Sequence, residues 1–211
     1  MIKGLQLGLA IVLITMMTTL LHAAEFGSNS ANISNPYIGP DNTAAFIHAG
    51  YGTKNMMYEY GHTVGTDIVD GVKCYRHISI RTEFAEYNES WVAQDTSGDI
   101  YFLKYWDGED PEPVVLGKDN AVLLLPADPQ VNDVIFGDKT VLQIGVTVPQ
   151  LSTGLGPFTN CLKTQETDGD IVYYAPNVGE VKKEYAGEVG GYELKEIITT
   201  DSGTRVVVIP F

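Results

Sequence analysis

Turn-forming residues divide the chain into short stretches from Lys54 onward, with a turn every eight to twelve positions. Between the turns, β-branched and aromatic residues alternate with polar ones, as they do along a strand with one buried face. An apolar period of 3.6 residues, which marks an amphipathic helix, is nowhere sustained for three turns. The sequence therefore predicts an all-β single domain, in which hairpins build one strongly curved antiparallel sheet or an open barrel.

The turn-forming residues predict where the hairpins lie. VDGV at 69–72, SGDI at 97–100 and TDGD at 167–170 are expected at hairpin tips, and a further turn runs from Pro176 to Gly179. Tyr173 and Tyr174 precede that turn, and adjacent strand residues point to opposite faces of a sheet. Strands are expected at 56–63, 71–82, 87–94, 100–106, 121–125, 140–148, 159–166, 170–175, 179–185, 192–200 and 204–209.

The first 24 residues have the layout of a secretory signal peptide. Lys3 is followed by an apolar run over 5–21 and then by two small residues, Ala23 and Ala24. An uncleaved anchor is the alternative, because the run is close to the shortest length that spans a bilayer. No second long apolar run follows. We therefore expect a periplasmic or secreted protein with no stable membrane span once the signal is removed.

Composition then divides the remaining chain in two. Residues 25–53 are rich in Asn, Ser, Pro and Gly, which predicts a flexible or loosely docked leader, and its apolar stretch 44–52 can pack against the domain. Residues 54–211 form the expected β domain. The chain carries 13 basic and 27 acidic residues, for a net charge of −14. Such a surface repels phosphate backbones, so nucleic acid is excluded as a partner, and the acidity is attributed to solubility.

Cys74 and Cys161 are the two cysteines of the chain. An exported location favours disulfides, and both residues fall in expected strands, so a disulfide between them is predicted over two buried thiols. A metal-binding or catalytic cysteine needs partners that two isolated cysteines without a CxxC spacing do not supply.

Five motifs follow one another along the chain: VDGV at 69–72, WVAQD with GDIYF at 91–102, LPA at 125–127, YYAPNVG at 173–179 and GGYEL at 190–194. Together they resemble a family of uncharacterised, secreted, β-rich bacterial proteins. The resemblance covers residues 56–198 and implies an exported β-rich protein, with no assigned activity and thus no catalytic residues. Leu103-Lys104 stands where that family often has Gly-Glu. Asn177 stands where Gly is usual, and Asn tolerates the positive φ of such a turn.

Signals of catalysis and metal binding are weak. The acidic loop at 107–112 offers hard oxygens but lacks the spacing of an EF-hand, so a solvated loop is expected. His48, His62 and His77 form no HExxH or His-x-His motif, and no G-x-S-x-G or phosphate-binding loop is present. We therefore predict no cofactor, no metal site and no catalytic residue.

Tyrosines give the remaining hint, because twelve of them occur in a mostly β chain. Aromatic side chains suit a sheet core, or a face that holds an apolar ligand. Tyr101, Tyr173 and Tyr174 are the candidate ligand-binding residues. Two hypotheses follow. One is an exported, non-catalytic binding or interaction protein that shelters an apolar ligand or binds a protein partner. The alternative is a hydrolase of cell-wall or extracellular polymers that uses an unidentified carboxylate pair.

Overall fold

The structure, a computed structural model, describes residues 24–38, 44–53, 58–81, 86–108, 110–149, 155 and 157–199. The strands are β1 (Ala44–Gly52), β2 (Tyr58–Val69), β3 (Val72–Arg81), β4 (Glu86–Gln94), β5 (Ile100–Trp106), β6 (Val114–Val115), β7 (Val122–Leu125), β8 (Val134–Ile135), β9 (Lys139–Val148), β10 (Phe158–Gln165), β11 (Ile171–Ala175), β12 (Gly179–Glu184) and β13 (Gly190–Thr199). Among the described residues, no helix has the length and apolar character needed to cross a membrane. Residues 1–23 of the expected signal peptide and the expected strand 204–209 lie outside this range.

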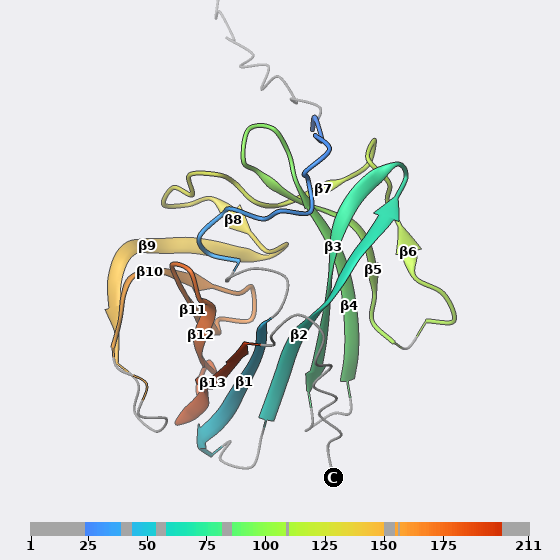
Figure 1. Ribbon diagram of the computed structural model, residues 1–211. Coiled ribbons are helices and arrows are strands. Elements are labelled where there is room, and N and C mark those ends of the chain that lie inside the picture. Colours follow the sequence, from blue (N-terminus) through green and yellow to red (C-terminus); the bar gives the residue numbers. More distant parts are fainter. Residues whose placement is uncertain are drawn as a thin grey trace, which may run out of the picture.

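All thirteen strands join one antiparallel sheet in the order β6-β5-β4-β3-β2-β1-β13-β12-β11-β10-β9-β8, with β7 also paired to β5. The sheet curls, so that β2–β6 face β8–β13 across the molecule (Figure 1). Its two ends approach each other where the backbone N–H of Phe136, just after β8, donates to the carbonyl oxygen of Leu124 in β7 at 2.5 Å. The predicted all-β fold, a strongly curved antiparallel sheet or open barrel, is confirmed.

The hairpin tips also lie where the turn residues place them. Val69 pairs with Val72 across Asp70 and Gly71, which both have positive φ, at 49° and 79°. That conformation belongs to the two-residue turn whose twist matches a hairpin, and Asp-Gly is one of its preferred sequences. Asn177 has φ of 61° in the turn between β11 and β12, as expected for a residue that replaces Gly.

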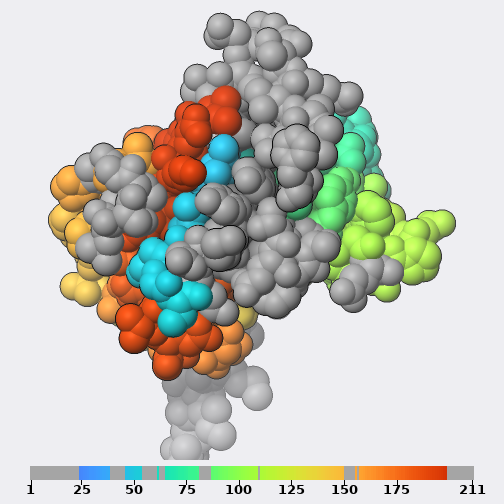
Figure 2. Space-filling model, turned by 90° about the horizontal axis from the view of Figure 1, so that it is seen from below, coloured from blue at the N-terminus to red at the C-terminus, as the bar shows by residue number. Residues whose placement is uncertain are grey.

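Strand β1 lies in the middle of the sheet, between β13 and β2. It pairs with β13 from Ala44 opposite Thr199 to Gly52 opposite Gly190. Seen from below, β1 in cyan runs beside the red β13 (Figure 2). The strand therefore joins the early part of the sheet to the late part, and the predicted domain boundary at residue 54 is wrong.

Residues 24–38 are docked as well. The backbone N–H groups of Gln94 and Thr96 donate to the carbonyl oxygens of Ser30, at 2.7 Å, and Glu25, at 2.8 Å. Ala31, which is 1% exposed, enters the hydrophobic core. The expectation of a flexible leader over 25–53 is thus wrong for the residues described. Its polar composition reflects turns that hydrogen-bond to the barrel rather than a lack of structure.

Three hydrophobic clusters form the core among the described residues. Ile100 and Phe102 pack in the first cluster with Leu125, Leu162 and other residues, whereas Val72, Cys74 and Trp91 pack in a second cluster. The split follows from strand alternation, since consecutive residues of β3, β4 and β5 enter different clusters. A third cluster contains Val148, Cys161, Ala175, Val181 and Leu194.

The predicted disulfide is also corrected. Cys74 and Cys161 are both free and buried. They belong to different clusters, on β3 and β10, and five strands separate β3 from β10 in the sheet order. Because the two side chains pack in separate clusters, they form no disulfide in this fold.

Candidate ligand-binding cavity

A cavity of about 400 Å³ lies inside the curled sheet. Its walls come from the docked N-terminal segment and from strands on both sides of the barrel, so it is a shared interior space rather than a groove on one hairpin. The size is within the range typical of small-molecule sites. Its lining comprises Tyr37, Ile38, Phe46, His48, Gly61, Tyr75, His77, Ser79, Ser90, Val92, Phe102, Leu124, Phe136, Lys139, Tyr174, Val178, Gly179 and Glu180.

A second cavity of about 560 Å³ adjoins the first. His77, Ser79, Ser90 and Phe102 line both, so the two cavities lie side by side along β3, β4 and β5. The second is also bordered by Trp106 and by residues of the loops around β6. An elongated ligand seated in the first cavity therefore has space to extend into the second.

Aromatic rings dominate the wall of the first cavity. Phe136 stacks on Tyr174 with ring centroids 4.5 Å apart, and Tyr75 stacks on His77 at 6.4 Å. Gly61 makes room for the second pair, because a Cβ at this position would lie 3.1 Å from the His77 ring. These rings give the wall apolar contact area, beside polar residues such as Ser79, Ser90 and Lys139.

His48 is a buried polar residue on this wall. Its side chain is 7% exposed, and its Nε2 lies 2.9 Å from the backbone carbonyl oxygen of Glu180. Its ring meets that of Tyr192 edge-on, at 5.4 Å between centroids. Within the described part of the chain, Nδ1 of His48 is buried and has no hydrogen-bond partner. An unpaired polar atom that is buried in this way is costly.

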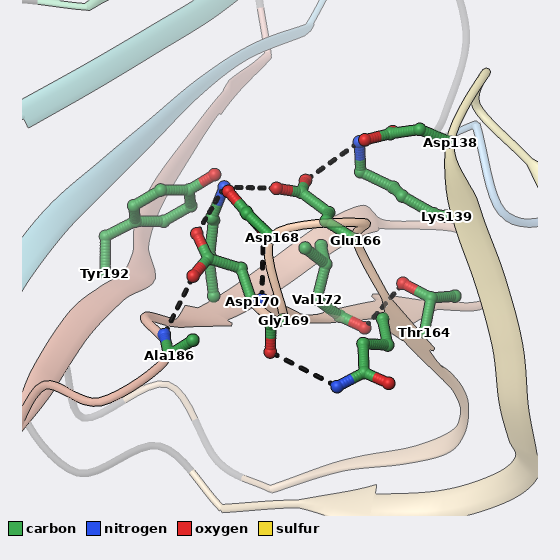
Figure 3. Close-up of polar contacts among 12 residues, drawn as sticks. Asp138, Lys139, Thr164, Glu166, Asp168, Gly169, Asp170, Val172, Ala186 and Tyr192 are labelled. Atoms are coloured by element: carbon green, nitrogen blue, oxygen red, sulfur yellow. Dashed lines mark hydrogen bonds and ion pairs between the residues drawn. The ribbon is translucent and has the colours of Figure 1, made fainter.

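A cluster of buried charges lies beyond Lys139. The ammonium of Lys183 is 2.7 Å from Glu166 and 3.1 Å from Asp170, while Lys139 is 2.9 Å from the other oxygen of Glu166. Figure 3 shows Glu166 reaching toward Lys139 on one side, and Asp170 toward the backbone N–H of Ala186 on the other. The cluster holds together the β10–β11 hairpin, β12 and the start of β9.

The protonation of this cluster follows from its pairing. Burial alone would raise the pKa of Glu166, but hydrogen bonds from Lys183 and Lys139 lower it below the ordinary value. Burial alone would lower the pKa of Lys183, but its hydrogen bonds to Glu166 and Asp170 raise it. Both groups therefore stay charged near neutral pH.

The same cluster contains three carboxylates that lie close enough together to hold a metal ion. Oxygens of Glu166, Asp168 and Asp170 lie within 4.8 Å of one another. Lys183 is inserted between two of them, and Asp168 accepts the backbone N–H of Asp170 at 3.0 Å. A lysine ammonium thus occupies the position that a cation would take, and the arrangement serves as a structural charge cluster.

The structure separates the three predicted ligand-binding tyrosines. Tyr174 lines the cavity, whereas Tyr101 packs with the Trp91 cluster, edge-on to Phe26 at 5.8 Å. Tyr173 packs in the third cluster, and its hydroxyl donates to Glu184 at 3.0 Å. Burial and the Glu184 carboxylate raise the pKa of Tyr173 to about 12. Of the three, Tyr174 alone contributes to the cavity.

The described residues of the acidic loop at 107–112 form hydrogen bonds within the loop and with Trp106. Asp107 accepts the backbone N–H of Asp110 at 3.2 Å, and the indole N–H of Trp106 donates to the carbonyl oxygen of Asp110 at 2.7 Å. These contacts are those of a capped turn.

Sequence reasoning missed His48 and an internal repeat. A lone histidine in an apolar stretch gives no motif, and residues 44–52 were assigned to the leader. The repeat was visible as TSGDI at 96–100 and TDGDI at 167–171. In both turns the glycine has φ of 98°, and the following aspartate accepts a loop N–H, from Ala127 at 2.7 Å or from Ala186 at 2.8 Å. The two hairpins therefore use the same local design on opposite walls of the cavity.

No known protein family and no curated protein sequence matches the chain. Among solved structures, the chain is similar to a protein of Parabacteroides distasonis ATCC 8503 that is named as a putative lipoprotein. The identity is 11% and the TM-score is 0.42, with 78% of this chain and 99% of that chain covered. A likeness of this degree carries no argument about activity.

Proposed function

We propose that this protein is an exported, non-catalytic binding protein that shelters a small, largely apolar ligand inside its curled sheet. The observation that carries the proposal is the interior cavity of about 400 Å³, with aromatic walls from both halves of the barrel. Apolar surface inside a folded protein is filled by its own side chains unless a space is kept for another molecule. The adjoining cavity adds room in one direction along β3–β5.

The export part of the proposal rests on the sequence of residues 1–24 and on the resemblance to secreted β-rich proteins. A periplasmic or secreted location agrees with the acidic, nucleic-acid-repelling surface. N-terminal sequencing of the protein recovered from cells tests it. A mature start near Glu25 is expected, and an intact Met1 in the membrane fraction would contradict it.

The alternative function, a hydrolase with a carboxylate pair, receives less support from the cavity. Among its described lining residues, Glu180 is the single carboxylate, and it accepts a hydrogen bond from the Tyr192 hydroxyl. Glu166, in the neighbouring charge cluster, has a lowered pKa. A general acid in a glycosidase needs a raised one. We therefore favour binding over hydrolysis.

Binding is tested with phenylnaphthylamine, a neutral apolar dye that becomes fluorescent when it leaves water. The wild-type protein should bind about one dye per chain. Ser90→Phe projects a ring into the space that both cavities share and should weaken binding at least tenfold. Val189→Phe, at a position that is 82% exposed, is the matched control and should bind as the wild type does. Equal binding by all three proteins would contradict the proposal.

A further inference from the structure

We infer that the edge of the sheet at β6 and β7 docks onto a lipid surface with zwitterionic head groups. The inference goes beyond the proposed function, because the edge can dock while the cavity is empty, and the cavity can fill without docking. It comes from large apolar side chains that are 37% to 62% exposed on neighbouring strands. These residues, called the apolar edge below, are Tyr105, Val114, Val115, Val122 and Leu123.

The residues of the apolar edge are adjacent in the sheet. Strands β6 and β7 both pair with β5, and β6 ends the order of the described strands (Figure 1). Single apolar side chains scattered over a surface are normal, whereas an adjacent group marks a contact with another molecule or with a membrane. The apolar edge is therefore a candidate interaction surface.

One face of the apolar edge borders the second cavity. Residues directly opposite each other in an antiparallel pair share a face of the sheet. Val114 lies opposite Tyr105, and Val122 lies opposite Phe102. Tyr105, Val122 and Phe102 line the second cavity. Docking at this edge would thus bring the second cavity to the lipid surface, where apolar molecules are dissolved.

The other face of the edge is apolar as well. Val115 lies opposite Lys104, whose ammonium is 4.1 Å from the centroid of the Trp91 ring. Leu123 lies opposite Tyr101, which packs with Trp91 in the second cluster. A flat protein surface could cover one face of such an edge. A lipid surface surrounds an inserted edge and covers both faces at once.

A second copy of the chain is a poorer fit to the apolar edge. Strand β6 has two residues, so it offers little backbone for the addition of a strand from another molecule. The chain also carries a net charge of −14, which makes two copies repel each other.

Charge beside the edge selects the head group. The loop that leads from β5 to β6 carries Asp107, Asp110 and Glu112, whereas the nearby Lys118 pairs with Asp119 at 2.7 Å. An anionic lipid surface would repel this loop. Phosphatidylcholine and phosphatidylethanolamine have no net charge, and their cationic amines lie at the outer end of the head group. The acidic loop therefore favours a zwitterionic surface.

The test is flotation of the mature protein, recovered from cells, with vesicles of phosphatidylcholine. The wild type should float with the vesicles, and replacing part of the lipid by phosphatidylglycerol should weaken its binding. Val115→Glu and Leu123→Glu should each lower the partition coefficient about tenfold, since each loses apolar contact with the lipid. Both positions are exposed, so both variants should keep the wild-type melting temperature.

Val189→Glu is the matched control. Val189 is 82% exposed between β12 and β13, away from the apolar edge, and the variant adds the same charge. It should float as the wild type does. A loss as large as that of Val115→Glu overturns the inference, because charge alone would then explain the effect.

Three other results also overturn the inference. They are no flotation of the wild type, tighter binding to vesicles that contain phosphatidylglycerol, and a wild-type dimer in light scattering that Val115→Glu converts to a monomer. The last result would assign the edge to a second copy. Dye binding separates the inference from the proposed function, because Val115 does not line the cavities and Val115→Glu should bind the dye as the wild type does. Absence of dye binding in the wild type contradicts the proposed function, while flotation still decides the inference.

Discussion

Replacement of Lys183 by methionine should destabilise the protein strongly. Its side chain is 9% exposed, and those of its partners Glu166 and Asp170 are 13% and 9% exposed. Removing one partner of a buried ion pair leaves the other charges uncompensated and costs about 3–5 kcal/mol. For a domain of this size, 1 kcal/mol shifts the melting temperature by about 2–4 °C. Thermal unfolding followed by circular dichroism at pH 7 should therefore show a decrease of roughly 6–20 °C.

The pH dependence gives this prediction a second, independent readout. The pKa of Glu166 is lowered in the folded state, so its contribution to stability is present above the unfolded value of about 4.3 and is lost as the pH falls. The pKa of Lys183 is raised, so its contribution is present below about 10.4 and is lost as the pH rises through the folded value. The difference between wild type and Lys183→Met should be largest between these limits and should narrow in acid.

Lys118→Met provides the matched control, because Lys118 pairs with Asp119 on the surface, where both side chains are exposed. Its melting temperature should equal that of the wild type. The reasoning is refuted if Lys183→Met also melts with the wild type at pH 7, or if the difference between them grows below pH 4.

Three further predictions concern the cysteines, one glycine and the repeated turns. Cys74 and Cys161 should each react with a thiol reagent only after unfolding, since burial raises the pKa of both thiols to about 11, and a native mass that rises by two hydrogens on reduction would contradict this. Gly191→Ala should lower the denaturant midpoint severely, because its Cβ would overlap a backbone carbonyl oxygen of β12. Wild-type stability of this variant would show that β12 and β13 do not lie as close together at Gly191 as the structure has them. Asp99→Ala should cost about 1 kcal/mol through the loss of one backbone partner, and Asp170→Ala clearly more, since it also loses its ion pair; equal losses in urea unfolding would count against the charge cluster.

The strands and hairpins were accessible from the sequence because their signals are local. Asp70-Gly71 alone fixes a turn type, and the alternation that follows it fixes which residues share a face. Strand β1 was missed because its flanks are rich in Gly, Pro and Asn, and because its partner β13 is far away in the chain. Strands β6 and β8 have two residues each, too few for any period to be visible.

The candidate site was only partly predictable, for a physical reason. Tyr174 could be found because aromatic residues before a turn must occupy one face or the other, but alternation cannot say which face encloses space. His48 lines the cavity only because β1 lies in the middle of the sheet, and this is a property of the assembled barrel. The disulfide was mispredicted for a similar reason, since strand membership does not reveal how many strands separate Cys74 from Cys161.

A crystal structure with decanol brominated at its far end would test the central claim most directly, because the anomalous signal of bromine locates the ligand without assumptions. The account predicts one bromine peak per chain within the adjoining cavities, near Phe102. A fully packed interior without bromine, or peaks confined to exposed apolar residues such as Val115 and Val189, would contradict it.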